Sequence, residues 1–225
     1  MSEIAQTSAD EISVRVLLVD DHDLFRTGLR NLLEERGVQV AGEAAAGAEA
    51  VRLVRELAPD VVVMDLHMPG ISGIEAIRQI ASIAPLTRVL VLTISDQDED
   101  VLHAILAGAC GYLLKDASVD ELIRGIEAAA VGESLVSPAI AGKVLQQVRA
   151  TTVSPEAADA IRAELSQREL DVLKLISSGK DNAMIAAELH ISPKTVKNHI
   201  SNILMKLQIE NRIQAAVYAV RSGIV

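Results

Sequence analysis

Aromatic residues are almost missing from this chain. Two tyrosines and one phenylalanine make up 1% of its 225 residues, and tryptophan is absent. Leu, Ile, Val and Ala must therefore build the hydrophobic cores. With 50% hydrophobic and 23% charged residues, the composition excludes extended disorder. The length favours two smaller domains over one.

Cysteine is also scarce. Cys110 is the only one in the sequence, so no disulfide can form within the chain. Its neighbours Gly108, Ala109 and Gly111 are small, which is typical of tight packing. The sequence predicts a buried structural thiol here rather than a reactive one.

Long apolar runs are lacking as well. Charges, prolines and glycines interrupt every run well before the roughly 18 residues that a membrane span needs. No basic segment leads an apolar one at the start of the chain, as a secretory signal would require. We therefore expect a cytoplasmic protein without a membrane partner.

Positive charges are outnumbered in most of the chain. The net charge is −10, yet residues 161–225 hold 9 Lys and Arg against 6 Asp and Glu, a net of +3. The rest holds 12 against 25, a net of −13. This asymmetry predicts an acidic body joined to a mildly basic tail that is a candidate for binding nucleic acid.

Short apolar runs alternate with amphipathic stretches from Val14 onward. The apolar runs predict strands at about 14–20, 38–44, 61–65, 87–93 and 111–114. The amphipathic stretches predict helices at about 24–33, 47–57, 72–83, 98–107 and 119–131. Nearly continuous apolar strands imply burial on both faces. The pattern predicts an α/β fold with a flavodoxin-like, doubly wound, five-stranded parallel sheet.

The rest of the chain predicts a linker and a second, all-α domain of four helices. Ser137 and Pro138 predict the start of a linker helix that ends near Val148, and the polar residues 151–160 follow it. Ser166 and Glu169 form a capping box that begins the next helix. The predicted boundaries are an N-terminal extension at 1–13, a first domain at 14–132, a linker at 133–162 and a second domain at 163–225.

Polar side chains follow the predicted parallel strands, where ligands bind in sheets of this kind. Asp20 and Asp21 end the first strand, Asp65 the third and Thr93 the fourth, while the fifth leads into Lys115. Two carboxylates about 4 Å apart repel by roughly 1–4 kcal/mol. Three carboxylates together therefore predict a divalent cation, and their hard oxygen ligands suit Mg²⁺ or Mn²⁺.

This set of side chains is suited to accepting a phosphoryl group. An acid beside such a cation can attack phosphorus and form an acyl phosphate, while Thr93 and Lys115 can bind the phosphoryl oxygens. Each acid could instead simply cap the helix that follows it. His22 and His67 could be metal ligands, but the carboxylates suffice without them.

The strand VVVMD with MPG after it, and GYLLK further on, resemble the receiver domain of bacterial two-component response regulators over about residues 14–132. The resemblance implies that Asp65 is the phosphoacceptor. It implies that Asp21, Asp65 and the backbone carbonyl of His67 bind Mg²⁺ directly, and that Asp20 binds it through water.

The same resemblance assigns the other polar residues of the site. Thr93 would be the switch hydroxyl and Lys115 the lysine that pairs with the phosphoryl group. Tyr112 lies where the family often has an aromatic that turns inward on activation; the alternative is an ordinary half-buried tyrosine. Asp116 is a departure, because many receivers have proline there after a cis bond. A cis bond before any other residue costs roughly 3 kcal/mol, so the sequence leaves this bond's geometry open.

The basic tail contains two helices separated by a short turn near Ile191. Ser192 and Pro193 predict the start of the second of them. Its apolar stripe comprises Val196, Ile200, Ile203, Leu204 and Leu207. Its opposite face carries Lys194, Lys197, Asn198, Ser201 and Asn202. Such residues bind phosphates and base edges when a helix enters the major groove, although a polar face of a helical bundle would look the same.

Residues 163–220 resemble the LuxR-type DNA-binding domain. The segments that carry the resemblance are LSQRELDVLKLISSG, MIAAELHISPKTVKNHISNILMKL and NRIQAAVYA. The resemblance implies that Lys197, Asn198 and Ser201 face bases. It implies phosphate contacts for Lys194, Thr195, Asn202 and Lys206. The last helix, near 211–220, resembles the family's dimerisation element, though its apolar residues equally fit packing within the domain.

Together these features predict a DNA-binding transcriptional response regulator of the NarL/FixJ subfamily. A sensor histidine kinase would phosphorylate Asp65, and phosphorylation would control homodimer formation and binding to promoter DNA. An alternative is a metal-dependent phosphatase or phosphotransferase with a DNA-binding-like tail, but no further acid or base is assigned to turnover, so we do not expect an enzyme. A second alternative is a constitutive DNA-binding protein whose receiver serves only as a scaffold.

Overall fold

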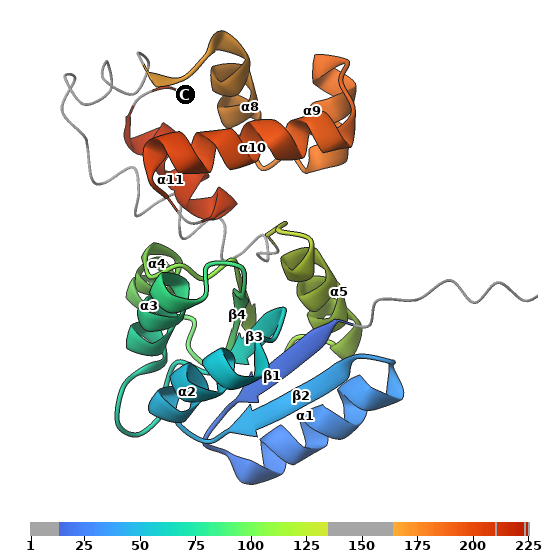
Figure 1. Ribbon diagram of the computed structural model, residues 1–225, viewed down its shortest axis with the longest axis vertical. Helices are drawn as coiled ribbons and strands as arrows, with labels where there is room; N and C mark the ends of the chain where they lie inside the picture. Colours follow the sequence, from blue (N-terminus) through green and yellow to red (C-terminus); the bar gives the residue numbers. More distant parts are fainter. Residues whose placement is uncertain (1–13, 135–163, 210, 223, 225) are drawn as a thin grey trace, which may run out of the picture.

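A computed structural model describes residues 14–134, 164–209, 211–222 and 224 (Figure 1). The strands are β1 (Arg15–Val19), β2 (Gln39–Ala44), β3 (Val61–Met64), β4 (Arg88–Thr93) and β5 (Gly111–Leu114). The first five helices are α1 (Asp23–Glu35), α2 (Gly47–Leu57), α3 (Gly73–Ile83), α4 (Asp98–Leu106) and α5 (Val119–Ala130). The others are α8 (Gln167–Ser177), α9 (Asn182–Leu189), α10 (Pro193–Leu207) and α11 (Arg212–Arg221). The predicted N-terminal extension, linker helix and polar linker lie outside the described residues.

The five strands form one parallel sheet in the order β2-β1-β3-β4-β5. This is the predicted flavodoxin-like order. The central strand β3 is buried along its whole length, because helices cover both faces of the sheet. Its partner β1 is in register so that Val19 pairs with Met64, which brings the residues after the two strands to the same edge.

The helices α1 to α5 lie in two layers, one on each face of the sheet (Figure 1). Leu29 and Leu33 of α1 pack in one buried cluster with residues of α5, while residues of α2, α3 and α4 pack in the other. Cys110 is 4% exposed and its thiol donates to the Val89 carbonyl at 3.2 Å. The predicted burial of this thiol is confirmed, and burial raises its pKa to about 12.

Gly73 allows α3 to begin close to the end of β3. A Cβ atom at this position would lie 2.2 Å from the Asp65 carbonyl oxygen and 2.6 Å from the Leu66 Cα. Since both are backbone atoms, they could not move aside. Ser72 caps the same helix by accepting a hydrogen bond from the Glu75 N–H at 3.3 Å. The start of α3 thus supports the segment that carries Asp65.

The C-terminal domain is a bundle of the four predicted helices. The capping box of Ser166 and Glu169 forms as predicted. The Glu169 carboxylate is buried and lies 2.7 Å from the Lys206 ammonium. Burial opposes ionisation, but hydrogen bonds from Lys206 and Ser166 outweigh it and lower the pKa of Glu169. This ion pair fastens α10 to the start of α8.

The final helix α11 also packs against the N-terminal domain, beside the C-terminal end of α4. The side-chain amide of Asn211 donates to the Ala109 carbonyl at 2.9 Å, and that of Gln214 donates to the Ile105 carbonyl at 2.9 Å. Val217 is 3% exposed and belongs to a buried cluster of the N-terminal domain. Carbonyls at the end of α4 and in the segment after it therefore accept hydrogen bonds from the other domain.

No helix in the described part of the chain is both long and apolar enough to cross a bilayer.

Candidate functional site

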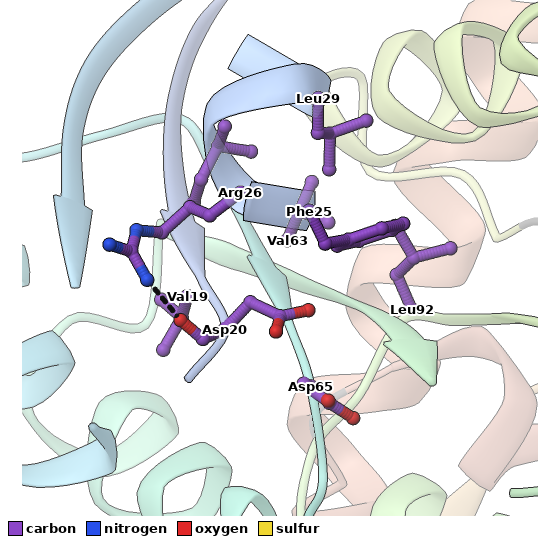
Figure 2. A pocket seen from close by; sticks show the side chains of 9 residues that line it. Val19, Asp20, Phe25, Arg26, Leu29, Val63, Asp65 and Leu92 are labelled. Atoms are coloured by element: carbon purple, nitrogen blue, oxygen red, sulfur yellow. Dashed lines mark hydrogen bonds between the residues drawn. The ribbon is translucent and has the colours of Figure 1, made fainter. Parts of the chain in front are cut away.

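Asp20 and Asp65 lie side by side beyond the ends of neighbouring strands, as the sequence predicts. Their exposed fractions are 5% and 2%. One oxygen of Asp65 accepts a hydrogen bond from the Leu66 N–H at 2.7 Å. Figure 2 shows the carboxylate of Asp20 turned towards the side on which Asp65 lies. The buried strand β3 thus holds Asp65 in place at the edge of the sheet.

Lys115 joins the two carboxylates. Its Nζ lies 2.6 Å from Asp20 Oδ2 and 2.7 Å from Asp65 Oδ2, and 4.7 Å from the centre of the Phe25 ring. Burial by itself lowers the pKa of Lys115, but the hydrogen bonds with Asp20 and Asp65 outweigh it and raise that pKa overall. The ammonium therefore stays charged and offsets part of the repulsion between the acids.

The acids also form a potential cation site. Ligand atoms of Asp20, Asp21, His22 and Asp65 lie within 4.8 Å of one another. Three of these ligands are carboxylates, the donors that Mg²⁺ and Mn²⁺ prefer, and the Asp21 side chain is 30% exposed and open to water. The donor set therefore fits the predicted cation.

The imidazole ring of His22 lies within hydrogen-bonding distance of two of the acids. Its Nδ1 is 2.9 Å from Asp21 Oδ1 and 3.2 Å from Asp20 Oδ1, while 65% of its side chain is exposed. Its backbone N–H also donates to Asp20 Oδ1 at 2.8 Å. In this arrangement the ring is a hydrogen-bond partner of the carboxylates. His67 lies further along the edge, with Nε2 3.5 Å from Asp100 Oδ2.

Thr93 and Tyr112 occupy the interior beside this edge. Both are fully buried, so the half-buried alternative for Tyr112 is wrong. The Tyr112 hydroxyl donates to the Ser95 carbonyl at 2.8 Å, and burial raises its pKa. The Ser95 hydroxyl in turn donates to Asp100 in α4 at 2.5 Å. No peptide bond in the described ranges is cis, so the bond between Lys115 and Asp116 is trans.

Sequence reasoning missed two residues of α1 that contact this site. Phe25 lies under Lys115, and Arg26 donates from Nη1 to the backbone oxygen of Asp20 at 2.6 Å. A signal was available for Arg26. It precedes Leu29 and Leu33 at helical spacing on the buried face of α1, and its side chain is only 12% exposed.

The polar face of α10 is open to solvent. Its apolar stripe is packed in the core of the C-terminal domain, and Ser192 caps the helix by accepting from the Thr195 N–H at 3.1 Å. The exposed residues of the predicted DNA-binding set are Lys194, Lys197, Asn198, Ser201, Asn202 and Lys206. Lys206 is paired with Glu169, and the Lys197 ammonium lies 3.9 Å from the Glu133 carboxylate at the end of the N-terminal domain.

Both halves of the chain match known families. A model described as response regulator receiver domain matches residues 16–127, and one described as bacterial regulatory proteins, luxR family, matches residues 163–219. The transcriptional regulatory protein LiaR of Bacillus subtilis (strain 168) is 46% identical over 214 residues, which cover 94% of this chain and 99% of LiaR. The nitrate/nitrite response regulator protein NarL of Escherichia coli (strain K12) is 37% identical over 204 residues, covering 90% of this chain and 93% of NarL.

Solved structures of similar length match as well. The crystal structure of the response regulator ChrA of a heme-sensing two-component system has a TM-score of 0.52 and 36% identity, covering 95% of this chain and 99% of ChrA. A structure of two RcsB dimers bound to two parallel DNAs has a TM-score of 0.55 and 25% identity, covering 93% of this chain and 98% of RcsB. The chain therefore belongs to the NarL/FixJ family of two-component response regulators, transcriptional regulators that join a receiver domain to a LuxR-type DNA-binding domain.

Proposed function

We propose that Asp65 accepts a phosphoryl group from a sensor histidine kinase. The observation that carries this proposal is the position of its carboxylate. It is 2% exposed, lies at the end of a buried strand and shares the Lys115 ammonium with Asp20. We assign the cation, Mg²⁺ or Mn²⁺, to Asp21, Asp65 and the backbone carbonyl of His67, with Asp20 binding it through water. When bound, it would neutralise charge on the phosphoryl oxygens.

The transfer forms one bond and breaks another. An Asp65 oxygen attacks phosphorus while the bond between phosphorus and the phosphohistidine nitrogen breaks, and the electron pair of that bond stays on the imidazole. Lys115 then turns from Asp65 to a phosphoryl oxygen, keeping Asp20 as its second partner. The Thr93 hydroxyl donates a hydrogen bond to another phosphoryl oxygen.

The direct test uses a small phosphodonor. Wild-type protein incubated with acetyl phosphate and Mg²⁺ should gain the mass of one phosphoryl group, as measured by intact mass spectrometry. The same reaction with excess EDTA should leave the protein unmodified, because the carboxylates repel the incoming phosphoryl group without a cation. Equal phosphorylation with and without chelator would contradict the cation's role, and no phosphorylation under either condition would contradict the acceptor itself.

Promoter DNA is the proposed target of α10. The exposed polar face of this helix supports major-groove binding. RcsB, a relative of the same architecture, has been solved as dimers bound to DNA. Residues 161–225 carry a net charge of only +3, so one copy should bind phosphates weakly. A homodimer on two half-sites would provide the missing affinity.

Lys197→Ala should weaken binding to the cognate promoter by about 1–3 kcal/mol, because a base contact is lost. Lys174→Ala is a matched control, since it removes the same charge from an exposed position on α8. A salt titration of promoter binding measures both. Equal affinities for the two variants would contradict the assignment of α10 as the recognition helix.

The position of α11 supports control of dimerisation by phosphorylation. In this structure Ile213, Val217 and Val220 pack against a receiver cluster, whereas the recognition face of α10 is exposed. If α11 mediates dimerisation, as its resemblance implies, the two domains must separate first. The receiver would thus restrain the dimerisation helix rather than cover the recognition helix.

A further inference from the structure

Arg26 occupies an unusual place for a charged side chain, on the buried face of α1 directly behind the acidic site. Its guanidinium makes three contacts. Nη1 donates to the Asp20 carbonyl at 2.6 Å, Nη2 to Asp23 Oδ1 at 2.6 Å and Nε to Glu43 Oε2 at 3.0 Å. These partners follow β1, begin α1 and belong to β2, respectively. The Arg26 guanidinium therefore connects three segments around the loop that carries Asp20 and Asp21.

The contact with Asp20 fixes a peptide group rather than a carboxylate. Figure 2 shows the guanidinium bonded to the backbone oxygen of Asp20, on the side of the residue away from its carboxylate. That oxygen belongs to the peptide that joins Asp20 to Asp21. A change in the ψ angle of Asp20 would turn this peptide and move Asp21 away from the other acids, and the short hydrogen bond opposes such a change.

Asp21 depends on this restraint more than the other two acids do. The carboxylates of Asp20 and Asp65 are both held by Lys115. Asp21 instead is 30% exposed, and its partner is the ring of His22, which is itself 65% exposed. Its position is therefore set mainly by its backbone.

We infer that Arg26 is a positioning residue for the cation site, acting on Asp21 through the Asp20 carbonyl. The inference rests on the proposed function, because it assumes that Asp21 is a cation ligand. Groups that orient metal ligands without touching the metal typically change metal affinity by about 10–100-fold. Arg26 should act in this way although its own positive charge repels the cation.

The two possible effects of Arg26, positioning the loop and repelling the cation, predict opposite changes in cation affinity when it is replaced. If Arg26 acted only through its charge, Arg26→Gln would tighten cation binding and Arg26→Lys would leave it unchanged. If it positions the loop, both variants weaken binding by about tenfold, because neither lysine nor glutamine reproduces the three-way contact. Mn²⁺ binding to the full-length protein, followed by electron paramagnetic resonance, distinguishes these outcomes without any phosphoryl transfer.

Arg30→Gln is the matched control. Arg30 lies one turn further along α1 and also binds Glu43, at 2.8 Å, but its side chain is 45% exposed and its contacts are with Glu34 and Glu43. Removing its charge should change Mn²⁺ affinity by less than about twofold, since it lies outside the site and surface charges are screened. Thermal unfolding of each variant checks that the fold is kept.

A second readout covers the case in which Arg26→Gln does not fold. In Arg26→Lys, the Mg²⁺ concentration for half-maximal phosphorylation by acetyl phosphate should rise about tenfold while the maximal rate stays near the wild-type value. Wild-type affinity in Arg26→Lys, or tighter binding in Arg26→Gln, would overturn the inference. Failure of the wild-type protein to bind Mn²⁺ would instead overturn the proposed cation site.

Discussion

Asp65→Asn should not gain a phosphoryl group from acetyl phosphate, with the rate falling on the order of 10³-fold or more. Asparagine has the same shape and can still accept the hydrogen bond from the Leu66 N–H. Its amide, however, is a very poor nucleophile towards phosphorus and a much weaker cation ligand than a carboxylate. The loss therefore measures the chemistry of the carboxylate rather than the packing of the strand. Intact mass after incubation with Mg²⁺ and acetyl phosphate is the measurement.

The control for this variant is Asp116→Asn. Asp116 directly follows Lys115 and is exposed, so its removal changes the local charge equally without touching the buried site. Its phosphorylation should match that of the wild type. Persistent mass gain in Asp65→Asn would move the acceptor to another acid, and peptide mapping would identify whether Asp20 or Asp21 takes that role.

The same substitution also changes Lys115. Burial lowers the pKa of its ammonium, but the hydrogen bonds that it donates to Asp20 and to Asp65 outweigh burial and raise that pKa. Losing the charge of Asp65 removes one of these contributions while burial continues to lower the pKa. The pKa of Lys115 should therefore fall in Asp65→Asn, which site-specific NMR titration can follow.

The parts of the fold that the sequence predicted well depend on local signals. The strand β3 is buried along its length because its apolar run has no polar face. The capping box at the start of α8 forms between Ser166 and Glu169, which are only three positions apart. The acids meet because parallel strands end at one edge of a sheet. Each of these features follows from a few neighbouring residues or from the geometry of parallel strands.

The features that were missed depend on tertiary contacts. Phe25 gives no sign in its local sequence that it will lie 4.7 Å from Lys115. Likewise, the pattern of α11 fits dimerisation or packing within its own domain, and nothing in it indicates that Gln214 binds the end of α4, 109 positions earlier. The hydrophobic pattern predicts which face of a helix is buried, but not which element buries it.

Gln214→Glu should open the contact between the two domains. Gln214 is 8% exposed and its amide donates to the Ile105 carbonyl. A carboxylate of the same shape would face that carbonyl at the negative end of α4, without a proton to donate. The lost hydrogen bond and the buried charge together should cost about 3 kcal/mol, a shift on the order of a hundredfold in the docking equilibrium.

The substitution should spare α11 itself, which makes the result interpretable. Asn211 is the N-cap of this helix, so residue 214 is its third position. An acidic side chain there is favourable for a helix. Separation of the two domains is measured by hydrogen exchange at the end of α4 and by sedimentation of the full chain, both without a phosphodonor.

Gln167→Glu provides the matched control, because it adds the same charge to the first turn of α8 at an exposed position. Its exchange and sedimentation should match those of the wild type. If docking restrains the DNA-binding half, Gln214→Glu should also bind promoter DNA more tightly than Gln167→Glu before any phosphorylation. Unchanged exchange at α4 would mean that the contact does not hold the domains together in solution. Opening without any gain in DNA binding would favour a receiver that serves only as a scaffold.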